Sequence, residues 1–307
     1  MNAAHPSRRI YVAEVVTRDG FQSEPQFIPT TDKIALIDRM SEAGYAAIEV
    51  SSFTSPKAIP MLADADAVFA GITRNPAVEY LALVPNVRGA ERALAARADA
   101  FNLVMSVSEA HNQANLRMSR EQSFAQLQDV IRLARDHDTP VNVSLSTSFG
   151  CSLAGPVAPD DVMHWARRFA DLGVRGISLC DTTGMADPAA VGALCERAVA
   201  AFPQLQITLH FHNTRGMGLA NVVTALQAGI RHFDASLGGL GGCPYAPGAT
   251  GNICTEELVH MLERMGYDTG MDLQLLLACA AQLERLVGRT VPSQLLRAGP
   301  VPTVALS

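Results

Sequence analysis

Two histidines that are one residue apart, His210 and His212, stand at the end of an apolar segment over residues 206–209. Alternate side chains of an extended strand point to the same side, so the two imidazoles project together, about 7 Å apart along the chain. Two imidazoles that face one space supply part of a metal site, but two buried structural histidines would show the same spacing. The choice between these interpretations depends on what else the chain brings to the same place.

A carboxylate that could complete this set is Asp19, which follows an apolar segment near the start of the chain. Two histidines and one carboxylate leave positions on an octahedral ion open for substrate oxygens and water. Nitrogen and oxygen ligands without thiolate favour Mg²⁺ or Mn²⁺ over structural zinc. Fe(II) oxygenases use the same set, but the alternation of strands and helices described below does not resemble their usual all-β scaffold. The alternative for Asp19 is a turn residue, since Asp-Gly is a common turn pair.

Arg18 directly precedes Asp19 and could stabilise negative charge that develops on an oxygen at this place. Its alternative is a surface ion pair. Glu49 lies within another apolar segment, where an unpaired carboxylate would be costly to bury. An ion pair between Arg18 and Glu49 would satisfy both side chains, and we expect one.

A segment with six glycines, residues 238–252, suits a lid over an active site. It lacks the Gly-x-x-x-x-Gly-Lys-Ser/Thr pattern of a phosphate-binding loop. Cys243 is its one side chain able to act as an acid or base near neutrality, although it could equally be a tolerated small residue. Asn252, at the end of the segment, could supply a carbonyl ligand to an ion.

The elements that must position these residues are eight short apolar segments that alternate with helical patterns. Such alternation predicts a parallel sheet, and eight units predict a closed (β/α)₈ TIM barrel with extra C-terminal helices. We expect one barrel domain over residues 1–307, with 238–254 as an active-site loop and C-terminal helices within 255–290. The expected strands are residues 10–16, 46–50, 80–84, 100–107, 141–146, 176–179, 206–210 and 232–236.

A barrel of this kind carries its active site at the carboxyl ends of the strands. The candidates named so far all follow strands or lie late within them. Asp181 follows the sixth expected strand and Asp234 lies in the eighth. The prediction is therefore one site at the barrel mouth.

The composition is that of a globular enzyme, because 48% of the residues are hydrophobic and only 18% are charged. A formal charge of −6 argues against a nucleic-acid partner, and no apolar run is long enough for a membrane span. The cysteines show no Cys-x-x-Cys spacing, which favours buried thiols in a reducing compartment. The first residues lack a signal-peptide core, so we expect a cytoplasmic protein.

The chain resembles the 3-hydroxy-3-methylglutaryl-CoA lyase family over about residues 10–287. The Arg-Asp-Gly and His-x-His motifs are shared across a wider superfamily of Claisen-type barrels, whereas the Gly-Gly-Cys-Pro-Tyr-Ala sequence of the loop is more specific to the lyases. The segments that carry the resemblance are Val16–Gln22, Ile48–Lys57, Ser106–Asn112, Ser178–Gly184 and Gly238–Asn252.

The resemblance implies a carbon–carbon lyase that cleaves 3-hydroxy-3-methylglutaryl-CoA to acetyl-CoA and acetoacetate, as in leucine degradation and ketone-body formation. It implies that a divalent ion, Mg²⁺ or Mn²⁺, is bound by Asp19, His210, His212 and Asn252. The expected partner is an acyl-CoA substrate, and we expect a homodimer or a higher homo-oligomer.

The resemblance also implies that Arg18 stabilises the thioester enolate and that Cys243 takes part in proton transfer. Glu49 and Asp181 match family positions that are important for activity near the site. The chain departs from the family pattern at four positions, which are Phe21, Ser23, Cys180 and Asn213.

These departures leave the acyl substrate open. The alternatives are a related 3-hydroxy-3-substituted acyl-CoA such as citramalyl-CoA, a condensing synthase of the isopropylmalate type, and a binding barrel without activity. The intact Cys243 loop weighs against the synthase, and the complete set of site residues weighs against an inactive barrel.

Overall fold

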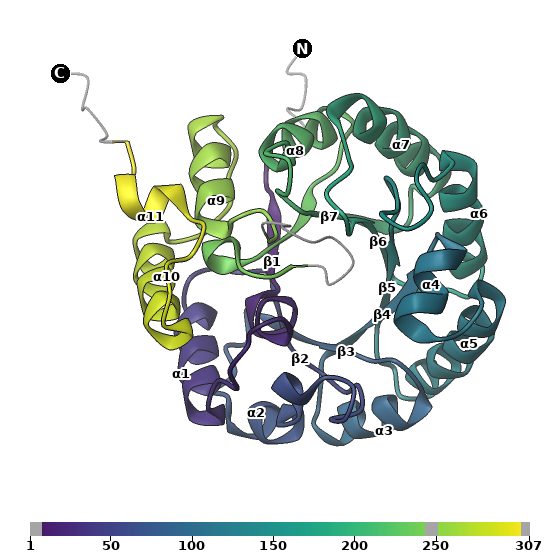
Figure 1. The fold of residues 1–307 in the computed structure, drawn as a ribbon, viewed down its shortest axis with the longest axis horizontal. Helices are drawn as coiled ribbons and strands as arrows, with labels where there is room; N and C mark the ends of the chain where they lie inside the picture. Colours follow the sequence, from purple (N-terminus) through teal and green to yellow (C-terminus); the bar gives the residue numbers. More distant parts are fainter. Residues whose placement is uncertain (1–7, 243–250, 302–307) are drawn as a thin grey trace, which may run out of the picture.

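Eight parallel strands pair in chain order in the computed structural model, which describes residues 8–242 and 251–301 (Figure 1). The last strand also pairs with the first, so the sheet closes without an edge. This confirms the predicted (β/α)₈ barrel. The strands are β1 (Tyr11–Glu14), β2 (Ala47–Ser52), β3 (Glu79–Leu83), β4 (Ala100–Ser106), β5 (Val141–Ser146), β6 (Gly176–Asp181), β7 (Gln206–Phe211) and β8 (His232–Ala235).

Helices surround the barrel and cover the outer face of its sheet (Figure 1). Their starts follow local capping chemistry. In α7, Pro188 occupies the first helical position, and the Asp187 carboxylate accepts hydrogen bonds from the backbone N–H groups of Ala189 and Ala190. The helices between β1 and β8 in the chain are α1 (Thr30–Ser41), α2 (Ala65–Gly71), α3 (Val87–Ala95), α4 (Glu109–Leu116), α5 (Arg120–Asp136), α6 (Pro159–Ala170), α7 (Pro188–Ala201) and α8 (Gly218–Gln227).

The C-terminal helices lie together at one side of the barrel, next to α1 (Figure 1). They are α9 (Thr255–Arg264), α10 (Leu273–Val287) and α11 (Gln294–Ala298), and short 3₁₀ turns occur at Pro60–Leu62 and Leu237–Gly239. Across residues 8–242 and 251–301, no helix has both the length and the apolar character needed to cross a membrane.

Strand β1 is shorter than predicted, since it stops at Glu14 and a π-helical turn follows at Val16–Gly20. The carbonyl of Val15 accepts hydrogen bonds from the backbone N–H groups of Arg18, Asp19 and Gly20, at 3.2, 2.7 and 3.4 Å. This turn points Arg18 and Asp19 into the barrel mouth rather than along the strand. Single π-helical turns of this kind are frequent at functional sites.

A buried carboxylate holds the π-helical turn in place. Oε1 of Glu14 accepts hydrogen bonds from the backbone N–H groups of Val16 and Leu237, both at 2.9 Å. Its Oε2 accepts from the hydroxyls of Tyr45 at 2.6 Å and Thr255 at 2.8 Å. One side chain therefore joins the turn after β1 to the end of β8 and the start of α9.

Candidate active site

Asp19, His210 and His212 come together at the carboxyl end of the barrel, and one possible ligand atom from each lies within 4.8 Å of the others. The Nε2 atoms of the two histidines are 3.4 Å apart, and Nε2 of His210 lies 4.0 Å from Oδ2 of Asp19. All three residues are buried. The structure therefore brings together the three members of the predicted set, from a turn and a strand nearly two hundred positions apart.

The charges around this cluster favour the protonation states that a metal site needs. Burial opposes the ionised form of Asp19, yet Arg18 and the two histidines lower its pKa to about 2. Burial and the neighbouring His210 lower the pKa of His212 to about 4. Near neutrality Asp19 is an anion and His212 is a neutral imidazole, so each has lone pairs to offer.

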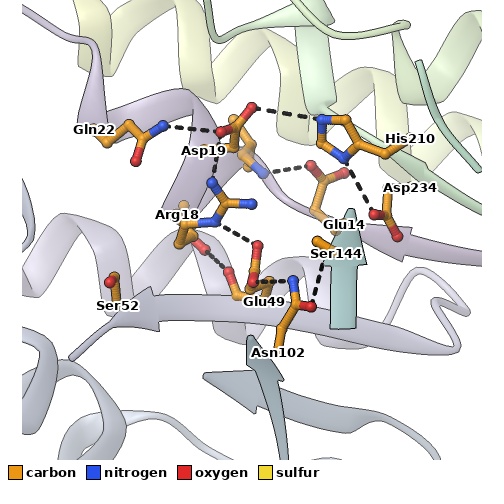
Figure 2. Close-up of polar contacts among 12 residues, drawn as sticks. Glu14, Arg18, Asp19, Gln22, Glu49, Ser52, Asn102, Ser144, His210 and Asp234 are labelled. Carbon is orange, nitrogen blue, oxygen red and sulfur yellow. Dashed lines mark hydrogen bonds and ion pairs between the residues drawn. The ribbon is translucent and has the colours of Figure 1, made fainter. Parts of the chain in front are cut away.

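His210 is oriented by a second carboxylate. Its Nδ1 lies 3.1 Å from Oδ2 of Asp234 on β8, whose Cα is the register partner of His210 in the sheet (Figure 2). Burial works against protonation of His210, but the hydrogen bond and charge of Asp234 outweigh it and raise the pKa. A proton held on Nδ1 by Asp234 leaves the lone pair of Nε2 directed toward His212 and Asp19.

Asn252 reaches the same cluster from the end of the glycine-rich segment. Backbone hydrogen bonds from Asn213 N to Gly251 O and from Ile253 N to Phe211 O lay this part of the chain along the end of β7. The amide nitrogen of Asn252 donates to Oδ2 of Asp19 at 2.7 Å. The structure thus places Asn252 at the site, with its nitrogen toward Asp19; rotation of the amide would present its carbonyl oxygen instead.

Arg18 forms the predicted ion pair with Glu49. Its Nε donates to Oε2 of Glu49 at 2.5 Å, and its Nη1 donates to Oδ1 of Asp19 at 2.6 Å (Figure 2). Burial opposes the charge of Arg18, but Glu49 and Asp19 together raise its pKa above the usual value. Nη2 makes no hydrogen bond within residues 8–242 and 251–301, so it remains available to an oxygen atom in the barrel mouth.

The carboxylate of Asp181, at the end of β6, binds the backbone of the loop that follows the strand. Its Oδ1 accepts hydrogen bonds from the backbone N–H groups of Met185 and Ala186 at 2.7 and 3.0 Å. Its Oδ2 is buried with no hydrogen-bond partner among the described residues, and burial raises the pKa to about 6. Within the part of the chain that the structure covers, no hydrogen bond connects Asp181 to the Asp19 cluster. Cys243, the predicted proton-transfer residue, lies outside the described residues.

The donor chemistry of the cluster fits a divalent cation. The Nε2 atoms of the two imidazoles lie 3.4 Å apart, and lone pairs on both would repel one another unless a proton or a cation lay between them. An ionised carboxylate oxygen stands beside them, and no thiolate is present among the three ligand residues. Mixed nitrogen and oxygen ligands of this kind suit hard or borderline divalent ions.

Several residues of the site were not assigned a role from the sequence. Asp234 orients His210, Glu14 anchors the turn that carries Arg18, and Asn102 donates to Glu49 at 2.8 Å. The signal for Glu14 was present, because it is a carboxylate within an apolar strand, as Glu49 is. Asp234 and Asn102 become recognisable only once the register of the strands is known.

Fold and site define a class of protein: a (β/α)₈ barrel with a candidate divalent-metal site and a buried guanidinium at its mouth. A family model described as HMGL-like matches residues 9–283. The chain belongs to this HMGL-like family, which confirms the family assignment and the carbon–carbon lyase class predicted from the sequence.

Similar proteins agree on this family. A hydroxymethylglutaryl-CoA lyase of Bacillus subtilis (strain 168) is 45% identical over 287 residues, which cover 94% of this chain and 96% of the relative. An (R)-citramalyl-CoA lyase of Chloroflexus aurantiacus is 39% identical, with 95% of each chain covered. The solved structure of an HMG-CoA lyase from Acinetobacter baumannii, in complex with coenzyme A and 3-methylmalate, matches with a TM-score of 0.93 at 45% identity and covers 99% of each chain.

Proposed function

We propose that this protein cleaves 3-hydroxy-3-methylglutaryl-CoA to acetyl-CoA and acetoacetate. The observation that carries the proposal is the meeting of Arg18 with Asp19, His210 and His212 at one barrel mouth, in a chain of the HMGL-like family. In this retro-Claisen step a general base takes the proton of the 3-hydroxyl, the C3–O bond becomes the ketone of acetoacetate, and the C2–C3 bond breaks. The electron pair of that bond passes to the thioester enolate, and a proton added at C2 completes acetyl-CoA.

In this proposal Asp19, His210, His212 and Asn252 hold the divalent ion, Mg²⁺ or Mn²⁺. When bound, such an ion polarises substrate oxygens and fixes their geometry. Neighbouring residues set the protonation states of these ligands: Arg18 keeps Asp19 ionised, and Asp234 keeps the proton of His210 on Nδ1.

Arg18 offsets the negative charge that develops on the enolate oxygen. Its Nε and Nη1 are held by Glu49 and Asp19, so the guanidinium plane is fixed before substrate arrives and Nη2 is left for the enolate oxygen. We propose Cys243 as the residue that donates the proton to C2. We propose Asp181, the last residue of β6, as a neighbouring residue that shapes the site by holding the loop after the strand.

A second substrate has specific support. The citramalyl-CoA lyase of Chloroflexus aurantiacus is 39% identical over nearly the whole chain. Citramalyl-CoA also carries a tertiary 3-hydroxyl beside a carboxylate, and the same bond cleavage would release acetyl-CoA and pyruvate. The residues around Arg18 and Asp19 serve either substrate.

The test is the release of acetyl-CoA from each thioester by the purified protein, with Mg²⁺ or Mn²⁺ and after chelation. We expect acetoacetate from 3-hydroxy-3-methylglutaryl-CoA only when the ion is present, and no product from an Asp19→Asn variant that melts like the wild type. Product formation by the chelated protein would contradict the metal requirement. A kcat/KM for citramalyl-CoA above that for 3-hydroxy-3-methylglutaryl-CoA would make citramalyl-CoA the proposed substrate instead.

The homo-oligomer and the cytoplasmic location expected from the sequence stay predictions. Size-exclusion chromatography with light scattering tests the first, and cell fractionation tests the second.

A further inference from the structure

The interior of this barrel is unusually polar beneath the site. Barrels of this type are normally filled by layers of bulky branched side chains. Here a pocket of about 210 Å³ extends into the barrel from the amino ends of the strands, and its lining includes Asn102, Asn142, Ser178 and Thr208, from the four consecutive strands β4 to β7. Glu49 lines the same pocket, so the polar layer reaches up to the partner of Arg18.

The amide of Asn102 has one orientation that satisfies its neighbours. Its Oδ1 accepts hydrogen bonds from Nδ2 of Asn142 at 3.0 Å and from Oγ of Ser144 at 2.9 Å. Because two donors face this oxygen, the amide nitrogen must point the other way, where it donates to Oε1 of Glu49 at 2.8 Å (Figure 2). Asn142 is held in turn, since its Nδ2 also donates to Ser178 Oγ at 2.9 Å.

The carboxylate of Glu49 is thereby held at both oxygens. Asn102 holds Oε1 and Arg18 holds Oε2 (Figure 2). Without Asn102, Glu49 would keep a buried oxygen with no donor, and rotation of its carboxylate would move the acceptor of Arg18 Nε. A misplacement of about 1 Å at a reacting centre can lower a rate by about 10²-fold.

We propose that Asn102 is a positioning residue for catalysis: through Glu49 it fixes the guanidinium of Arg18 in the plane that the enolate oxygen requires. This inference rests on the proposed function of Arg18. It assigns a role in turnover to the barrel interior, below the residues that contact substrate. A merely structural role for Asn102 would affect stability and leave turnover as it is.

The main test is Asn102→Leu, which keeps the approximate shape of the side chain and removes both hydrogen-bonding groups. We expect kcat for the cleaved thioester to fall about 10- to 100-fold, with KM changed less than threefold and Mn²⁺ affinity unchanged. In a Glu49→Gln background the same substitution should have little further effect, because both changes act through one contact. Thr208→Val, in the lining of the same pocket, is the matched control and should keep wild-type turnover.

A second readout does not depend on turnover. The side-chain Nε–H of Arg18 is held by Glu49, so its NMR signal should be protected from exchange in the wild type and exchange faster in Asn102→Leu. If Asn102→Leu does not fold, Ser144→Ala, which removes one donor to Asn102, should show the same changes on a smaller scale.

The outcomes separate the two proposals. A wild-type protein that cleaves neither thioester defeats the proposed function, while faster Arg18 exchange in Asn102→Leu still supports the positioning by Asn102. Wild-type kcat together with unchanged exchange in folded Asn102→Leu overturns the positioning role, whatever the substrate. A lowered melting temperature with a wild-type kcat in Asn102→Leu would also overturn the positioning role of Asn102.

Discussion

Oδ2 of Asp234 lies 3.1 Å from Nδ1 of His210 (Figure 2), while the other ring nitrogen, Nε2, faces His212 and Asp19. The two residues are register partners on β7 and β8, so the sheet itself sets this contact. A carboxylate behind a metal-binding histidine fixes its tautomer and makes the other nitrogen a better ligand.

Asp234→Asn should weaken metal binding while the barrel remains folded. The amide can still accept the Nδ1 proton, but the negative charge that strengthens Nε2 is lost, and such losses typically cost about 10- to 100-fold in affinity. Titration with Mn²⁺, followed by electron paramagnetic resonance, measures this. Asp268→Asn, at an exposed carboxylate, is the control, and equal affinities in the two variants would argue against the role of Asp234.

Arg18→Gln should lower kcat by about 10²- to 10³-fold and leave Mn²⁺ binding in place. The physical reason is the loss of a fixed positive charge beside the developing enolate. Steady-state kinetics on the active thioester provides the measurement, and Arg132→Gln, at an exposed position, is the control. A loss confined to KM would assign Arg18 to substrate binding alone.

Glu14 should make folding stability fall as the pH rises. Burial raises its pKa from 4.5 to about 7, although four donated hydrogen bonds lower it. The fold therefore favours the protonated carboxyl, and this contribution is fully present below about pH 4.5 and is lost as the pH rises through about 7.

Between pH 5 and pH 8, the wild type should lose on the order of 3 kcal/mol of unfolding free energy relative to Glu14→Gln. Urea denaturation of the two proteins at each pH gives the difference, in which the other titrating groups cancel. Glu42→Gln, at an exposed position, should show no such trend. A constant difference between wild type and Glu14→Gln would refute the prediction.

Cys243 should be the first cysteine that a thiol reagent modifies. The other five are buried, and burial raises the pKa of Cys195 to about 12 and of Cys279 to about 11, while those of Cys180 and Cys254 also rise. Few of these thiols ionise near neutrality, and the thiolate is the reactive form. Peptide mass mapping after iodoacetamide treatment identifies the modified residue.

Substrate analogue with divalent metal should slow the modification of Cys243, if the glycine-rich segment covers bound substrate. Cys243→Ser should keep the fold and Mn²⁺ binding but lose most turnover, because a serine hydroxyl is too weak an acid near neutrality. Cys151→Ser is the matched control. Near-normal turnover in Cys243→Ser would remove it from proton transfer.

The barrel was predictable because its signals are local. Each signal is contained in a few consecutive residues: an apolar run predicts a strand, and a pair such as Asp187-Pro188 predicts the start of a helix. Helix α4 carries a weaker signal, because its sequence is mostly polar, although Ser108 caps its start by accepting a hydrogen bond from His111 N. The π-helical turn could not be predicted, because Glu14, which anchors it, also binds Leu237, 223 positions away.

The active site likewise has contacts that could be predicted from the sequence and contacts that could not. The Arg18–Glu49 ion pair could be predicted, because a buried carboxylate needs a partner and Arg18 lies at the end of the neighbouring strand. The contacts of Asp234 and Asn102 depend on strand register and side-chain rotamers, which composition does not encode. The amide orientation of Asn252 likewise arises from tertiary contacts with Asp19 and Leu240.

The glycine-rich segment is clamped at its base. Glu14 binds Leu237 on one side of it and Thr255 on the other, and backbone hydrogen bonds join Ser236 to both Ile253 and Thr255. These contacts hold the two ends of the segment beside one another without any contribution from residues 243–250. A change at Glu14 would therefore release the turn that carries Arg18 and Asp19 and both ends of the segment at the same time.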